Sequence, residues 1–208
     1  MLRDFLRGTY PSILVPDCTI LDVAGGRGDL SWILRNIDGV DSIIADPRIP
    51  NHRRLVKSVE FLLAHPEEAA VRSVEGLPTH QPLAKLLPRL FETNGMNAND
   101  ANDGIRSSSN QPVNLHSPHF MRMHVDNTLV ETLRRIGSKP SDETDLDVWD
   151  EYWTKEQCRI ESNKVHYGGT APKTQTTKMI DRESSQISDA QSALDVFRSL
   201  DIIVGFHP

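Results

Sequence analysis

The sequence predicts an α/β protein in which helices flank a parallel β-sheet. Two observations lead to this prediction. Within residues 1–65, short apolar runs alternate with segments whose apolar side chains recur at helical spacing. A further apolar run, Leu200–Phe206, follows another helical pattern near the end of the chain. Strands that alternate with helices pair in parallel, because each helix carries the chain back to the same edge of the sheet.

The first predicted strand and helix are separated by a glycine-rich stretch. Thr19–Ala24 (TILDVA) is a short apolar run that ends in small residues, which is typical of a buried strand. Gly28–Asn36 follows as a helix, with its apolar side chains at helical spacing. We therefore expect a strand, a sharp turn and a helix in this order.

The next two elements repeat that order. Ser42–Ala45 (SIIA) predicts a second buried strand, which ends at Asp46-Pro47. His52–Ala64 then predicts an amphipathic helix, whose apolar face comprises Leu55, Val59, Leu62 and Leu63.

Patterned segments return in the second half of the chain. We expect a third strand at Phe120–Val125, a helix at Asn127–Ile136 and a helix start at Ser188-Asp189. Residues 145–161 carry an apolar stripe formed by Leu146, Trp149, Trp153 and Ile160. At helical spacing, Trp149, Tyr152 and Trp153 indicate a core rather than a surface for stacking on bases.

Two polar stretches interrupt the predicted domain. Residues 93–114 contain six Asn and almost no large apolar side chain, and residues 163–186 are similarly polar. Such segments bury too little surface to offset the entropy lost on ordering. We therefore expect one domain, 1–208, with disordered insertions at 93–114 and 163–186.

Composition excludes several classes of protein. No apolar run approaches the roughly 20 residues of a membrane helix, so we expect no membrane contact. The net charge of −6 argues against indiscriminate binding to nucleic acid. Cys18 and Cys158 are too few for a disulfide framework, which favours an intracellular, cytoplasmic location. We expect Cys158 to be a small buried residue.

The glycine-rich stretch indicates a ligand site. It lacks the third glycine of a dinucleotide fingerprint, because Ser31 stands there, and no Lys follows as a P-loop requires. Instead, Asp22 is followed at alternate positions by Ala24, Gly26 and Gly28. A carboxylate beside the loop repels a pyrophosphate and attracts an ammonium group, so it favours a cationic amino-acid ligand.

A second acidic residue extends this site. Asp46 follows the second predicted strand, where a carboxylate can accept both hydroxyls of a ribose. Ribose hydroxyls together with an amino-acid ammonium describe S-adenosylmethionine. Two alternatives remain for the same residues: a tight turn that binds no ligand, and a site for NAD or a flavin.

The motif LDVAGGRGDL resembles the first motif of class I, Rossmann-like S-adenosylmethionine-dependent methyltransferases, roughly D-x-[GA]-x-G-x-G. The resemblance implies that S-adenosylmethionine is the cofactor. It implies that Asp22 and the loop surround the methionine moiety, with Asp46 at the ribose. The implied loop positions are Ala24, Gly25, Gly26 and Gly28. Ala24 stands where many members have glycine.

The last apolar run, LDIIVGFHP, resembles the fourth strand of the same family. The family's sheet continues beyond that strand, so we expect an incomplete sheet, apparently truncated after strand 4. Strand 200–206 would then be an edge that a partner chain could cover. His207 would lie at the mouth of the methyl-donor pocket, as a substrate-orienting residue or as an ordinary terminal residue. Asp126 loosely matches the position at which this family has an acidic residue near the adenine of the cofactor.

The function expected from these residues is methyl transfer to an acceptor that they do not identify. RNA, protein and small molecules all remain open as substrates, and no catalytic residue is assigned. The alternative is a non-catalytic interaction module of the same fold that binds a protein partner. His116, His119 and His124 lack a shared Cys or acidic ligand, so we expect an exposed, mobile cluster and no metal site.

Overall fold

The computed structural model describes residues 2–65, 67–68, 83, 86, 115–137, 143–163 and 186–205. Its centre is a five-stranded sheet in the order β4-β3-β2-β1-β5, in which every pairing is parallel. The strands are β1 (Thr19–Val23), β2 (Asp41–Ala45), β3 (His119–Met121), β4 (Gln186–Ile187) and β5 (Ile202–Gly205). The prediction of a Rossmann-like α/β sheet is confirmed.

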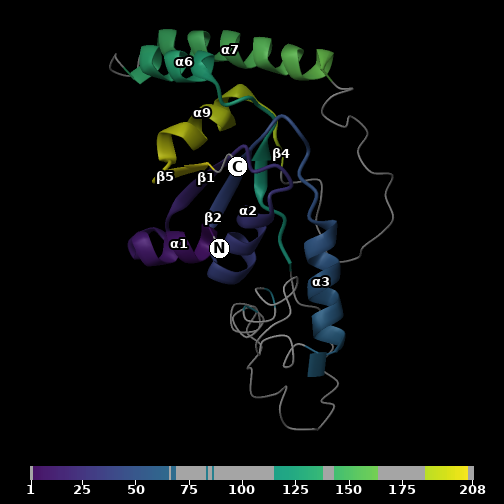
Figure 1. The fold of residues 1–208 in the computed structure, drawn as a ribbon. Coiled ribbons are helices and arrows are strands. Elements are labelled where there is room, and N and C mark those ends of the chain that lie inside the picture. Colours follow the sequence, from purple (N-terminus) through teal and green to yellow (C-terminus); the bar gives the residue numbers. More distant parts are fainter. Residues whose placement is uncertain are drawn as a thin grey trace.

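Helices cover both faces of this sheet (Figure 1). On one side lie α6 (Asn127–Gly137), α7 (Glu143–Ser162) and α9 (Ala190–Ser199). On the other lie α1 (Leu2–Thr9), the 3-10 turn η1 (Pro11–Ile13), α2 (Asp29–Ile33) with its π-helical continuation η2 (Leu34–Asp38), and α3 (Arg53–Ala64). Because both faces are covered, β1 is mainly apolar, with Asp22 as its one charged residue.

Neighbouring residues of β1 show how the two layers are packed. Ile20 and Leu21 are both fully buried, yet they belong to different clusters. Leu21 packs with residues of α6, α7 and α9, whereas Ile20 packs with Leu6 of α1 and Leu34 of η2. Successive side chains of a strand point to opposite faces, so one short run serves both layers.

The third strand ends earlier than the sequence predicts. It spans His119–Met121, and the chain then leaves the sheet to meet α7. Gln157 of α7 donates to the Arg122 carbonyl at 3.0 Å, and the His124 N–H donates to Glu156 at 2.7 Å. Side chains of a helix therefore replace the strand partners that the prediction assumed at 122–125.

Strand β4 was not predicted. Strand β4 pairs with β3 through Phe120↔Gln186 and Met121↔Ile187, so the expected disordered stretch 163–186 is wrong at Gln186. At its other end, Asn163 closes α7 by donating to the Ile160 carbonyl. Residues 164–185 and the whole of 93–114 lie outside the described residues.

Helix α1 was not predicted either, because it buries a charged side chain and exposes an aromatic one. Phe5 is 58% exposed, whereas Arg3 is 6% exposed and pairs with the Asp38 carboxylate at the end of η2. A buried ion pair of this kind needs both partners in place, since either charge alone would be costly. Apolar periodicity cannot reveal such an element.

Helix α7 carries the expected aromatic core. Trp149, Tyr152 and Trp153 are at most 8% exposed, and each indole donates to a carbonyl just before or at the start of α9. The prediction of a core is therefore confirmed. Two predictions on this helix are wrong, because Leu146 is 42% exposed and Cys158 is exposed.

The last described strand, β5, pairs with β1 alone among the described residues, as expected for an edge. Ile203 on this strand is 59% exposed. Phe206 and His207 lie outside the described residues, so the predicted role of His207 stays a prediction. Among the described helices, none is long and apolar enough to cross a membrane.

Candidate functional site

The glycine-rich loop and Asp46 meet at the carboxyl ends of β1 and β2. The two strands are in register, with Val23 opposite Ala45, so the residues that follow them emerge side by side. The Gly26 N–H donates to the Asp46 carboxylate at 3.0 Å. The structure therefore brings together the loop and the second acidic residue that the sequence predicts, at the edge where parallel sheets bind ligands.

The loop adopts left-handed backbone at alternate positions. Ala24 has φ 54°, Gly26 has φ 59° and Gly28 has φ 74°. A Cβ at Gly28 would overlap the Ile44 side chain and would lie 2.8 Å from the His52 ring. Glycine is thus required at 28 by both conformation and space. Ala24 accepts a conformation that costs an L-residue roughly 1 kcal/mol, which glycine at this position would avoid.

Asp22 lies directly beneath the loop and is only 4% exposed. A Cβ added at Gly25 would be 2.7 Å from one of its carboxylate oxygens, so the carboxylate faces this turn closely. Ser31 of α2 donates its hydroxyl to Asp22 at 2.9 Å, and Ser42 of β2 donates to Ser31 at 2.9 Å. These bonds form a buried polar chain that crosses from one strand to the next.

The environment of Asp22 disfavours its charge. Burial raises the pKa of Asp22 to about 6, the hydrogen bonds from Ser31 oppose this rise, and the nearby Asp46 adds slightly to it. Asp22 is thus a buried carboxylate without a cation at hydrogen-bonding distance among the described residues. Such a group is costly to retain and is characteristic of a functional site.

Asp46 is more fully bonded, although it is only 1% exposed. Its two oxygens accept from the N–H groups of Gly26 and Arg48 and from two nitrogens of the Arg48 guanidinium, at 2.8 to 3.0 Å. These four donors match the capacity of a carboxylate. A ribose could bind Asp46 only in exchange for the guanidinium, since the two backbone donors are part of the turn.

The sequence did not predict Arg48. The signal that could have found it is its position, two residues after a strand-ending carboxylate. Hydrogen bonding to Asp46, and the negative charge of that carboxylate, raise the pKa of Arg48 above its usual value, against a small opposing effect of burial. The guanidinium therefore stays charged beside the loop.

The loop after β3 lies next to Asp46. Arg122 donates from Nε to the Pro47 carbonyl at 3.2 Å, which joins the two loops. Asp126, at the predicted adenine position, accepts from the N–H groups of Thr128 and Leu129 and pairs with Arg159 at 2.7 Å. In the structure Asp126 therefore caps the start of α6 and links it to α7 through Arg159.

The three histidines do not form the exposed cluster that we expected. His116 is exposed, but His119 lies half-buried in β3, and His124 is half-buried with Nδ1 2.6 Å from Glu156. Within the described residues, no group of three or more His, Cys, Asp or Glu side chains could hold a metal ion.

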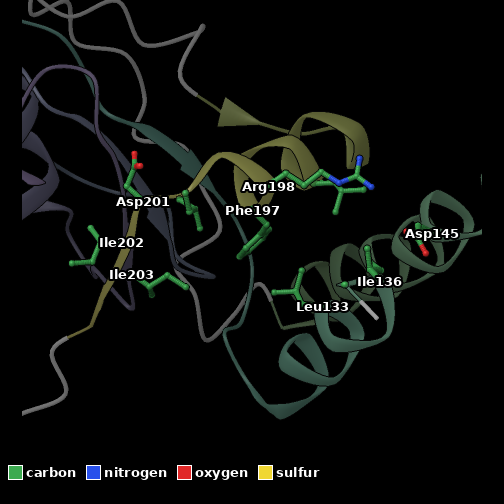
Figure 2. A pocket seen from close by; sticks show the side chains of 11 residues that line it. Leu133, Ile136, Asp145, Phe197, Arg198, Asp201, Ile202 and Ile203 are labelled. Carbon is green, nitrogen blue, oxygen red and sulfur yellow. The ribbon is translucent and has the colours of Figure 1, made fainter. Parts of the chain in front are cut away.

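A separate cavity of about 550 Å³ lies at the start of β5. Its walls come from α6 (Leu133, Ile136), α9 (Phe197, Arg198) and β5 (Ile202, Ile203), as Figure 2 shows. The cavity shares no residue with the glycine loop. It lies toward the amino end of β5, whereas the glycine loop follows the carboxyl end of β1.

The parallel sheet with helices on both faces is that of a Rossmann-like α/β protein. Comparison with models of protein families, with curated proteins and with solved structures finds no match.

Proposed function

We propose that the glycine-loop edge binds S-adenosylmethionine and that the protein belongs to the class of methyltransferases that use it. The observation that carries this proposal is the buried Asp22 carboxylate beneath the Gly25 turn. Burial raises the pKa of this carboxyl to about 6, so its negative charge is costly at this position. An ammonium or sulfonium group above the loop would offset that cost, whereas a pyrophosphate would increase it.

Asp46 supports the same proposal from the neighbouring strand. A buried carboxylate at the end of the second strand is the group that binds ribose hydroxyls in this class of fold. The glycine loop contacts both acids. The Gly26 N–H donates a hydrogen bond to Asp46, and the Asp22 carboxylate faces Gly25. One elongated ligand with a cation at one end and a diol at the other would meet both.

The residues of this chain would bind and orient the cofactor. S-adenosylmethionine, when bound, supplies an activated methyl group for transfer to a nucleophile. Over Gly26 the atom nearest to an added Cβ is Nη2 of Arg48, 3.4 Å away, so the guanidinium lies against this part of the loop. Holding the methyl carbon in line with an acceptor atom is the main contribution that such a site makes to rate. The acceptor could be RNA, a protein or a small molecule.

Calorimetric titration with S-adenosylhomocysteine tests this proposal. We expect wild-type protein to bind it and Asp46→Ala to lose at least about tenfold in affinity, since the ribose loses its charged acceptor. Asp29→Ala is the matched control, because it removes an exposed carboxylate from the same turn, where Asp29 pairs with Arg27. Equal affinity of wild type and Asp46→Ala would exclude the ribose assignment.

The second candidate function is a non-catalytic interaction module. The exposure of Ile203 on the edge strand, beside an apolar cavity, favours it. A partner chain that adds a strand along 200–206 would cover this edge. Sedimentation velocity separates the two functions, because a stable complex without binding of S-adenosylhomocysteine supports the module.

We also propose a cytoplasmic location. The support is that both cysteines are free thiols, with Cys158 exposed, which suits a reducing compartment.

A further inference from the structure

In the Asp46–Arg48 pair, the carboxylate is held firmly by the backbone, whereas the guanidinium is free to move away. Asp46 is held by two backbone N–H groups and its side chain is 1% exposed, whereas the side chain of Arg48 is 55% exposed. In the part of the chain that the structure describes, both side-chain hydrogen bonds of Arg48 go to Asp46. The guanidinium can therefore leave without breaking any other contact of this kind.

The guanidinium presents the same pattern of donors as a ribose diol. Its Nε lies 2.9 Å from one oxygen of Asp46 and its Nη2 lies 3.0 Å from the other. A vicinal diol likewise offers two hydroxyl donors to the two oxygens of one carboxylate. Exchange of guanidinium for diol would leave Asp46 with four donors, so no buried acceptor would be left unsatisfied.

The position of Arg48 also places it over the ligand path. Its Nη2 is the nearest atom, at 3.4 Å, to a Cβ added at Gly26. A ligand that lies over the glycine loop and reaches Asp46 must therefore meet the guanidinium first.

We propose that Arg48 is an internal competitor that occupies the diol subsite of Asp46 and must be displaced for a nucleoside ligand to bind. This inference rests on the proposed function. The competition selects for ligands that carry two vicinal hydroxyls, because a ligand with one hydroxyl cannot replace both guanidinium bonds. It also keeps the buried Asp46 paired with a cation while the site is empty.

Arg48→Ala tests the competition, again with S-adenosylhomocysteine in calorimetry. Removing the competitor should raise affinity roughly three- to tenfold, in keeping with the modest strength of a partly exposed ion pair. Arg27→Ala is the matched control, because Arg27 is a 53% exposed arginine of the same loop whose partner is the exposed Asp29. If charge near the loop were the cause, both variants would change affinity alike.

A second measurement observes the displacement itself. In the ¹H–¹⁵N spectrum of the wild type, the Nε–H signal of Arg48, assigned by its absence in Arg48→Ala, should be protected from exchange by Asp46. Saturating S-adenosylhomocysteine should move that signal toward the position of a solvated arginine. The Arg27 Nε–H signal should not move.

The outcomes distinguish this inference from the function on which it rests. If the wild type binds S-adenosylhomocysteine but Arg48→Ala binds equally or more weakly, the competition is wrong and the proposed cofactor site stands. If the wild type fails to bind and Arg48→Ala binds, both are supported. If neither binds, both are overturned.

Discussion

The two ends of the parallel sheet differ in chemistry: one buries charged side chains, and the other exposes apolar ones. At the carboxyl end of β1 and β2, two carboxylates are almost completely buried, and hydrogen bonds from Ser31, Gly26 and Arg48 surround them. At the start of β5, a cavity of about 550 Å³ has mostly apolar walls. Ile203 beside it is 59% exposed.

Each arrangement is unfavourable for an isolated chain, but for a different reason. Buried carboxylates cost free energy because they leave water, and exposed isoleucine costs free energy because it remains in water. The first cost is reduced by a small polar or cationic ligand, and the second by an apolar surface. The proposed ligand site therefore lies at the glycine-loop end, and the alternative proposal of a protein contact concerns the β5 edge.

The largest effect is expected at the glycine loop. Gly28→Ala must adopt φ 74° and bring its Cβ within 2.8 Å of His52, besides overlapping Ile44. Backbone strain and overpacking together should lower the free energy of unfolding by about 3 kcal/mol. Urea unfolding measures this loss.

Gly39→Ala is the control for that variant. Gly39 also has positive φ, 68°, but nothing lies within 4 Å of an added Cβ. It should lose only about 1 kcal/mol from backbone strain. Equal losses in the two variants would mean that the space beneath the loop is not tight.

The next largest effect on stability concerns the charge of Asp22. Removing this charge should raise the free energy of unfolding, whereas Gly28→Ala should lower it. Burial raises the pKa of Asp22 from its ordinary value of 3.8 to about 6, so the folded state holds the proton more firmly than the unfolded chain does. Stability should therefore fall as pH rises from about 4 to 6. Above that window the ionised carboxylate costs up to about 3 kcal/mol, from the shift in pKa.

Asp22→Asn should remove most of this cost and should also lose affinity for S-adenosylhomocysteine. We expect the variant to unfold at higher urea concentration than the wild type at pH 7.5, and the difference to shrink toward pH 4. Asp29→Asn, at an exposed position of the same turn, should show no such pH-dependent difference. A difference that stays constant with pH would contradict the raised pKa of Asp22.

The smallest effect on stability is expected at the β5 edge. Ile203→Lys places a charge on an exposed strand and should change the free energy of unfolding by less than about 0.5 kcal/mol. It should nevertheless weaken any association that uses this edge, measured by sedimentation velocity. Binding of S-adenosylhomocysteine should not change. A loss of binding in this variant would show that the two ends of the sheet are coupled.

Local pattern was sufficient to predict most of the fold. The strands at 19–23 and 41–45 and the helix at 53–64 follow from apolar runs and helical spacing, with ends within a residue or so of those predicted. The loop was predicted for a similar reason, since repeated glycines have few other uses after a buried strand. Asp22 and Asp46 were predicted because an acidic residue within a short apolar strand, or directly after one, is a local feature as well.

The rest could not be predicted, because it depends on contacts between distant residues. Strand β4 is two residues long and exists only by pairing with β3, which lies more than 60 residues earlier in the chain. The early end of β3 depends on Glu156 and Gln157 of α7. Helix α1 depends on Arg3 meeting Asp38 across the fold.

The amino-acid sequence by itself determined a parallel α/β sheet and a glycine loop flanked by two acidic residues, because strand, turn and helix preferences are local. Only the tertiary structure decided how those acids are paired. It buried Asp22 enough to raise its pKa, and it placed the Arg48 guanidinium on the oxygens of Asp46. Burial and competition between donors arise from atoms brought together in space, so no spacing along the chain could reveal them.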